Sequence, residues 1–115
     1  MAIETKQKKI HVINDLYGKL LNKKIQHGIV MKHYISIVLR EFLRTPRQAN
    51  IQNQINQVAT YNQEEKKKTI LSYAISVDDL TRLKELADYY FTVPNNVINA
   101  ILIYTLDKEE QKTGK

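Results

Sequence analysis

The second half of this chain shows its clearest alternation of apolar and polar positions. Residues 69–77 alternate along a run rich in β-branched and aromatic side chains, a pattern that predicts a strand. One face of this strand would carry Leu71, Tyr73, Ile75 and Val77. The other face would carry Ile70, Ser72, Ala74 and Ser76.

Two helices are predicted after this strand. Asp78 or Asp79 is typical of a helix start, because a carboxylate accepts free backbone N–H groups there. Apolar residues then recur at helical spacing: Leu80, Leu83, Leu86, Ala87, Tyr90 and Phe91. Pro94 cannot continue that helix but suits the first turn of another. The second helix has an apolar stripe made of Val97, Ile98, Ile101, Leu102 and Thr105 or Leu106.

The first half repeats this order less clearly. Ile10 and Val12 alternate with Lys9, His11 and Ile13. Asn14 or Asp15 would cap a helix with an apolar side made of Leu16, Leu20, Leu21 and Ile25, and Gly28 would end it. The next stripe is Ile35, Val38, Leu39, Phe42 and Leu43.

The two halves can be aligned element by element. The caps match best when Asn14 is set against Asp78, and the second helices when Ile35 is set against Ile98. These two alignments differ by one position, which predicts a one-residue deletion in the turn. Chance similarity between amphipathic segments is the alternative to a structural repeat.

The chain therefore divides into four segments. Residues 1–44 form the first unit, 45–68 a polar connector, 69–107 the second unit and 108–115 a polar, frayed tail. Within the connector, Ile51, Ile55 and Val58 are spaced as on one face of a short surface helix.

Charge is distributed unevenly over these segments. The 115 residues carry a net charge of +6. Residues 1–44 hold nine Lys or Arg against three Asp or Glu. Residues 69–115 hold five Lys or Arg against seven Asp or Glu. Clustered positive charge favours a polyanionic partner, and a solvated basic surface is the alternative. We expect a cytoplasmic protein, since there is no cysteine, no signal-peptide pattern and no apolar run long enough to span a membrane.

Signs of catalytic chemistry are absent from the sequence. The three glycines do not cluster into a phosphate-binding loop. His11, His27 and His33 lack the spacing and carboxylate helpers of a metal site. We therefore predict a protein that is not an enzyme and that uses no cofactor and no metal.

The segment from Thr69 to Leu106 resembles the ribbon-helix-helix (MetJ/Arc) family of DNA-binding proteins. The resemblance lies in the alternating strand, the acidic cap, the pattern Leu80-x-x-Leu83-x-x-Leu86-Ala87, the turn 92–96 and the stripe Ile98-x-x-Ile101-Leu102. It implies a mostly α-helical fold with a short antiparallel β-ribbon, in which two units pair their strands and interlock four helices. It also implies that the ribbon enters the major groove and that the second helix binds a phosphate at its N-terminus.

The resemblance assigns roles to particular positions. Base-reading residues would be Lys9, His11, Ile13, Ser72, Ala74 and Ser76. Phosphate-binding residues would be Lys8, Met31, Lys32, Lys67, Lys68, Asn95 and Asn96, with backbone N–H groups acting at the helix starts. The Ser-Ala-Ser set departs from the family, because it offers little hydrogen bonding. The register of the first strand has an alternative, since a shift of one residue would turn Ile10 and Val12 outward instead.

Two such units in one chain are similar to the TraY-like relaxosome accessory proteins of conjugative plasmids. That resemblance implies binding of double-stranded DNA at an origin of transfer, with a relaxase or another plasmid-transfer protein as partner. A ribbon-helix-helix repressor or plasmid autoregulator is the alternative. A non-catalytic protein-interaction module is a third hypothesis, of a different class. The chain would be a monomeric pseudo-dimer, or a homodimer if only the second unit forms a ribbon.

Overall fold

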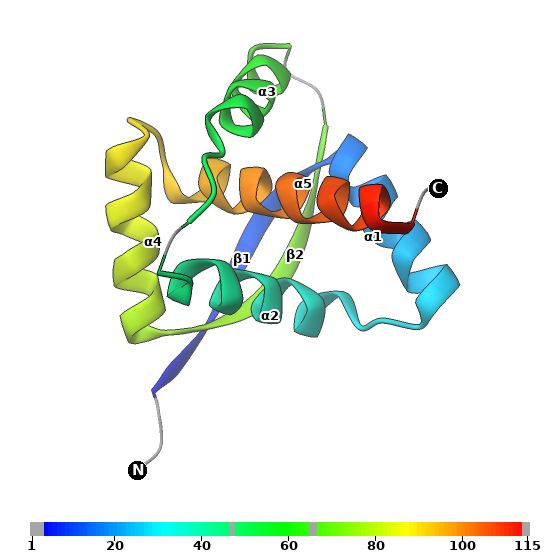
Figure 1. Ribbon diagram of the computed structural model, residues 1–115, viewed down its shortest axis with the longest axis horizontal. Coiled ribbons are helices and arrows are strands. Elements are labelled where there is room, and N and C mark those ends of the chain that lie inside the picture. Colours follow the sequence, from blue (N-terminus) through cyan, green and yellow to red (C-terminus); the bar gives the residue numbers. More distant parts are fainter. Residues whose placement is uncertain (1–3, 47, 65–66, 114–115) are drawn as a thin grey trace.

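The computed structural model describes residues 4–46, 48–64 and 67–113, with side chains described up to residue 110. These residues form five helices and a sheet of two antiparallel strands (Figure 1). The strands lie behind helices α2 and α5 in this view, while α4 and α1 flank them on the left and right. The prediction of a mostly helical fold with a short antiparallel ribbon is confirmed.

The two strands come from distant parts of the chain. Strand β1 (Thr5–Ile13) pairs along its whole length with β2 (Lys68–Ser76), and Lys9 lies opposite Ser72 at the centre. Ile10 and Val12 on β1 are fully buried, as Tyr73 and Ile75 on β2 almost are. Because side chains alternate between the faces of a strand, one face of the ribbon belongs to the core and the other does not. The prediction that Ile10 and Val12 point inward is confirmed.

Each strand leads directly into two helices. Strand β1 is followed by α1 (Asn14–His27) and α2 (Met31–Arg44), and β2 by α4 (Val77–Tyr89) and α5 (Pro94–Thr113). The elements β2, α4 and α5 each begin the same number of residues after their first-half counterparts β1, α1 and α2. The predicted alignment of Asn14 with Asp78 is therefore wrong, because Asn14 corresponds to Val77, and the helix starts require no deletion.

The predicted helix caps are also wrong, because both first helices begin earlier than expected. Ile13 precedes α1 and makes no side-chain cap. Ser76 precedes α4, and its hydroxyl accepts a hydrogen bond from Asp79 N at 3.1 Å. Serine is among the best N-cap residues, and here it satisfies one of the free N–H groups at the start of α4.

The turns after the first helices share a left-handed residue. Gly28 has φ 67° and Phe91 has φ 56°, and the same alignment of the two halves sets one against the other. Gly28 N donates to Lys24 O at 2.8 Å, which closes the end of α1. Glycine adopts this conformation without strain, whereas a bulky side chain does not. Phe91 was expected on the apolar side of α4, but it lies in the turn and is 96% exposed.

Each second helix packs on the strand of the other half. Helix α2 contacts β2 and α4, while α5 contacts β1 and α1 as well as α2. The buried side chains of α2 and α5 form the centre of the core: Ile35, Val38, Leu39, Leu43, Val97, Ile98, Ile101, Leu102 and Leu106. The two halves therefore share one core.

Helix α3 (Gln52–Gln63) lies in the connector and packs on α5, so the helix predicted there is confirmed. Ile51, Ile55, Val58 and Tyr61 are buried. The Tyr61 hydroxyl accepts a hydrogen bond from Asn14 N at 3.0 Å and donates one to Lys67 O at 2.6 Å. This contact joins the start of α1 to the start of β2.

Residues 108–113 continue α5, which ends at Thr113. The prediction of a separate frayed tail from residue 108 is therefore wrong for this stretch. Within it, Glu109 accepts hydrogen bonds from Lys23 at 2.7 Å and from the Tyr34 hydroxyl at 3.1 Å, which tie the helix end to α1 and α2.

Asp79 is a buried carboxylate held by two arginines. Its side chain is 3% exposed, and its oxygens lie 3.1 Å from Arg44 of α2 and 2.7 Å from Arg82 of α4. Burial by itself would raise the pKa of Asp79, but hydrogen bonds from Arg44, Arg82 and Ser76 outweigh it and lower the pKa below its ordinary value. The ionised form is thus the one that stabilises the fold.

We expect Asp79→Asn to lower the free energy of unfolding at neutral pH by about 2 kcal/mol, because charge-assisted hydrogen bonds are lost. A carboxylate with a lowered pKa in the folded state stabilises the protein above its unfolded pKa of about 4, and this stabilisation disappears as pH falls through the folded pKa. Urea unfolding between about pH 2 and 7 should therefore show a flatter acid limb for this variant. Asp78→Asn, which changes the neighbouring exposed residue, is the matched control. Equal pH dependence in both variants would contradict the prediction.

Candidate nucleic-acid interface

The face of the ribbon opposite the core is open to solvent. Gln7, Lys9 and His11 of β1 are exposed there, as are Ile70 and Ser72 of β2. In the antiparallel register Gln7 lies opposite Ala74, Lys9 opposite Ser72 and His11 opposite Ile70. Ala74 is half-buried. The structure thus brings four of the six predicted base-reading residues, Lys9, His11, Ser72 and Ala74, onto one surface.

The other two predicted base-reading residues are buried, so their assignment is wrong. Ile13 is 5% exposed and Ser76 is 8% exposed. Both are the last residues of their strands, where the chain turns into a helix and alternation no longer decides which way a side chain points. Ile13 packs in the core instead, and Ser76 caps α4.

Sequence reasoning missed Gln7 as a member of this surface. It also left Ile70 out of the base-reading set, although alternation had placed Ile70 on the same face as Ser72. Ile70 is 56% exposed. Extending the alternation by one step toward each strand's N-terminus would have included both residues.

The ribbon and its approach are basic. Five exposed lysines lie between Thr5 and Ile13 or between Lys67 and Ser76, and these two segments contain no carboxylate. The lysines are Lys6, Lys8, Lys9, Lys67 and Lys68. Lys66, the first residue of the predicted basic run, lies outside the described residues. Adjacent residues of a strand face opposite sides, so Lys8 lies on the helix side of β1 and Lys9 on the open side.

The start of α2 offers backbone N–H groups. The first intrahelical bond there runs from Tyr34 N to Val30 O at 2.9 Å, so the N–H groups of Met31, Lys32 and His33 precede the helical ladder. Val30 provides no side-chain cap. Together with the exposed Lys32, this helix start has the polar groups that the phosphate prediction requires.

The start of α5 is built differently. Pro94 has no N–H, and Asn96 N already donates to Val93 O at 3.0 Å. The side chain of Asn96 donates to the Thr92 hydroxyl at 2.9 Å and accepts from Asn62 at 3.1 Å. The Asn96 N–H is therefore engaged, and the prediction of a phosphate clamp at this residue is wrong.

Two asparagines of α5 bind the backbone edge of β1. Asn95 accepts from His11 N at 2.9 Å and donates to His11 O at 3.1 Å. Asn99, which is fully buried, accepts from Ile13 N at 3.1 Å and donates to His11 O at 3.1 Å and Asn95 O at 2.9 Å. The side chain of Asn95 is thus engaged with the strand. These bonds fix the backbone from which His11 projects.

The corresponding contact on β2 is weaker. Ser36, whose position in α2 corresponds to that of Asn99 in α5, accepts a single hydrogen bond from Ala74 N at 2.9 Å. The Ser36 hydroxyl itself donates to Lys32 O at 2.7 Å. The second helix of each half therefore supports the outer edge of the opposite strand, more firmly on β1 than on β2.

A groove of about 720 Å³ lies between α1, α3 and α5, with Asn53, Asn56 and Gln57 among its lining residues. Among the described residues no cluster of His, Cys, Asp or Glu is arranged to hold a metal ion. None of the described helices is long and apolar enough to cross a membrane. No protein family, curated protein or solved structure matches this chain.

Proposed function

We propose that this protein binds double-stranded DNA in a sequence-specific manner by placing the β1–β2 ribbon in the major groove. The observation that carries the proposal is the open ribbon face, which presents Gln7, Lys9, His11 and Ser72 beside the apolar Ile70 and Ala74 and carries no carboxylate. A two-stranded ribbon fits the major groove, where each base pair presents a distinct pattern of donors and acceptors.

We further propose that the chain contains two ribbon-helix-helix units in tandem. The constant sequence offset between corresponding elements supports this, as do the left-handed residues Gly28 and Phe91 at equivalent positions. Each second helix also packs on the opposite strand, as interlocked units require. A single chain then supplies both strands of the reading surface as a monomeric pseudo-dimer.

Within this arrangement the side chains have separate tasks. Lys9, His11 and Ser72 contact base edges, with Gln7 beside them, because hydroxyl, amide and cationic groups match the polar code of the groove. Ala74 and Ile70 offer apolar contact to thymine methyl groups. Lys8, Lys67 and Lys68 bind phosphates along the duplex, together with Lys32 and the N–H groups at the start of α2.

The biological setting that we propose is plasmid conjugation, in which the protein binds an origin of transfer and assists a relaxase. This rests on the resemblance to tandem accessory proteins. A repressor or plasmid autoregulator is the alternative, and footprinting decides between them: protection of the transfer origin supports the accessory role, and protection of a promoter alone supports the repressor.

The second candidate function, a non-catalytic protein-interaction module, is favoured by the exposed aromatic side chains Tyr89 and Phe91. The two functions differ in their response to salt. The four lysines assigned to phosphates, Lys8, Lys32, Lys67 and Lys68, should give a slope of about −3 to −4 for log K against log salt, because each neutralised phosphate contributes about −0.9. Fluorescence anisotropy with duplex DNA measures this slope. Absence of duplex binding at low salt would leave the interaction module as the better proposal.

A further inference from the structure

The two ends of the ribbon are held by different helices. At one end, which we call the α2 end, Gln7 lies opposite Ala74, and Ser36 of α2 accepts a hydrogen bond from Ala74 N at 2.9 Å. At the other end, the α5 end, Asn95 of α5 is bound to the backbone of His11. The N-terminal part of α2 therefore lies at one end of the ribbon and that of α5 at the other.

These two helix starts differ in what they offer to a phosphate. The constant offset between the halves sets the exposed Lys32 of α2 against Asn95 of α5. The side chain of Asn95 is already bound to His11. Pro94 has no N–H, and the N–H of Asn96 is engaged with Val93 O. The start of α5 therefore lacks the cation and most of the N–H groups that α2 places at its own end.

The starts of the two strands differ in the opposite sense. The same offset sets Lys67 against Glu4 and Lys68 against Thr5. In the antiparallel register, the start of β1 lies at the α2 end and the start of β2 at the α5 end. Both lysines are exposed, and alternation places Lys68 on the same open face as Ile70. The positive charge that is missing from the start of α5 is thus present at the start of β2.

The carboxylates of the adjoining segments leave these lysines unpaired. Asp15 at the start of α1 and Glu64 after α3 line the groove between α1, α3 and α5 rather than the open ribbon face. Neither Lys67 nor Lys68 forms an ion pair with a carboxylate in the described part of the chain. Both cations can therefore meet a phosphate at the α5 end.

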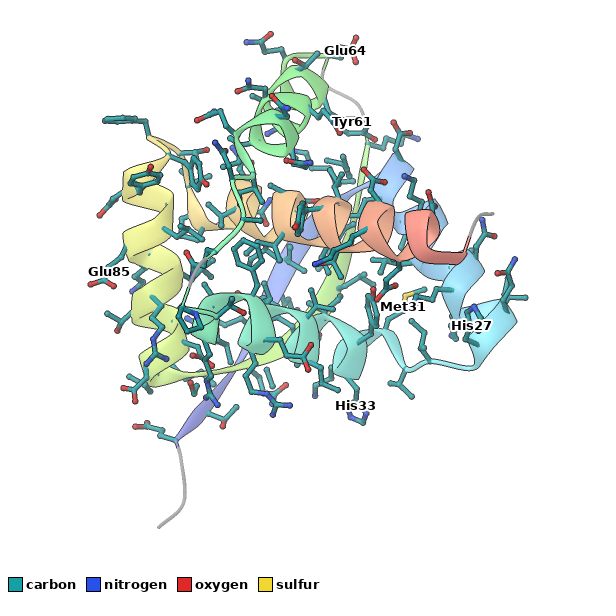
Figure 2. All side chains as sticks on the ribbon, viewed as in Figure 1. His27, Met31, His33, Tyr61, Glu64 and Glu85 are labelled. Carbon is teal, nitrogen blue, oxygen red and sulfur yellow. The ribbon has the colours of Figure 1, made fainter. Side chains whose placement is uncertain are left out.

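Helix α3 holds the backbone from which the two lysines project. The Tyr61 hydroxyl donates to Lys67 O at 2.6 Å and accepts from Asn14 N at 3.0 Å, and Figure 2 shows Tyr61 beside the start of β2. The Thr69 hydroxyl donates to Asn14 Oδ1 at 3.0 Å, so the chain is held on both sides of Lys68. Tyr61 is 6% exposed and packs in the core, which fixes its hydroxyl. A backbone that is ordered before binding loses less entropy when a ligand binds.

We propose that Tyr61 is a positioning residue for DNA binding. By holding Lys67, it makes the start of β2 the phosphate-binding element of the α5 end, in place of the helix start. The inference rests on the proposed function, because it requires a duplex on the open ribbon face. The two ends of the ribbon then bind phosphates by different chemistry, through Lys32 and backbone N–H groups at the α2 end and through two lysines at the α5 end. Helix α3, besides connecting the halves, orders one of these two phosphate sites.

The test removes one hydroxyl and keeps its ring. Tyr61→Phe loses the bonds to Lys67 O and Asn14 N but retains the packing in the core. Tyr90→Phe is the matched control, because the Tyr90 hydroxyl accepts from Ile51 N at 3.2 Å at the opposite end of α3. Circular dichroism melts check that both variants fold. Anisotropy titrations over a salt series use a duplex selected from a random pool for tight binding and a scrambled duplex.

Tyr61→Phe should weaken binding of both duplexes by about 3- to 10-fold, as expected for the loss of a hydrogen bond that orders a phosphate site. The preference for the selected duplex should stay unchanged, since phosphate contacts carry no sequence information. Tyr90→Phe should bind both duplexes like the wild-type chain. Replacing Lys67 and Lys68 together by alanine should reduce the salt slope by about 2. In that background Tyr61→Phe should have no further effect on affinity, because it acts through these lysines.

The outcomes separate this inference from the proposed function. A wild-type chain that binds no duplex at low salt overturns both. If the wild-type chain binds, equal losses of affinity in Tyr61→Phe and Tyr90→Phe overturn the inference alone. A reduced preference for the selected duplex in Tyr61→Phe also overturns it, because the hydroxyl then acts on the base-reading residues. A further loss of affinity from Tyr61→Phe in the variant without the two lysines does the same, since the hydroxyl then acts elsewhere.

Discussion

Replacing Lys9 by alanine is expected to reduce the preference for the cognate duplex over unrelated DNA by about 10- to 100-fold, since one good base contact contributes about 1–3 kcal/mol of discrimination. Lys9 lies at the centre of the open ribbon face, opposite Ser72. In the proposed complex, where the ribbon fills the major groove, a residue in this place is surrounded by base edges. Anisotropy titrations with cognate and scrambled duplexes, at one fixed salt concentration, measure the ratio of the two affinities.

The neighbouring residue provides the control for this experiment. Lys8→Ala removes the same charge from the same strand, but Lys8 lies opposite Tyr73 on the helix side. We expect Lys8→Ala to weaken binding to both duplexes equally and to reduce the salt slope by about 1. If both variants lose affinity for the two duplexes to the same extent, the ribbon attracts DNA without reading its sequence.

The second large effect is expected at Asn99, and it concerns stability. Asn99→Ala should lower the free energy of unfolding by about 3 kcal/mol, because three hydrogen bonds are lost at about 1 kcal/mol each and Ile13 N–H is left buried without this acceptor. For a domain of this size the melting temperature should fall by roughly 10 °C. Thermal and urea unfolding measure the change.

Ser36→Ala is the matched variant on the other strand. Ser36 holds the edge of β2 with a single hydrogen bond, so its removal should cost only about 1 kcal/mol. If the two variants lose similar free energies of unfolding, the edges of β1 and β2 are supported equally. That result would contradict the expectation from three hydrogen bonds at Asn99 and one at Ser36. The preference of each variant for the cognate duplex gives a second measurement. Because Asn99 holds the backbone under His11, Asn99→Ala should weaken this preference more than Ser36→Ala does.

Local pattern predicted much of this fold. Alternation placed Ile10, Val12, Tyr73 and Ile75 inward, and helical spacing found the buried stripes of α2 and α5, because a single buried face imposes a regular period on the sequence. Alternation failed at Ile13 and Ser76, where each strand turns into a helix. Such junctions depend on capping and packing, which periodicity does not encode.

The polar groups that organise the ribbon were harder to predict. Asn99 interrupts an apolar stripe, and from its sequence position it is indistinguishable from a solvent-facing residue. Its role depends on the edge of β1, which is far away in the sequence at Ile13. The start of α5 showed the same difficulty, since the side chains of Asn95 and Asn96 face protein partners that only the tertiary structure brings near. Phe91 also fitted the helical spacing, although the helix ends before it.

The pairing of β1 with β2 inside one chain has a thermodynamic consequence. A ribbon assembled from two identical subunits falls apart on dilution, because its folding equilibrium includes an association step. Here the two strands are joined covalently through α3, so ribbon formation is a unimolecular event. The melting temperature should therefore be the same at nanomolar and micromolar protein, and the ribbon stays intact even when a cell contains only a few copies of the chain.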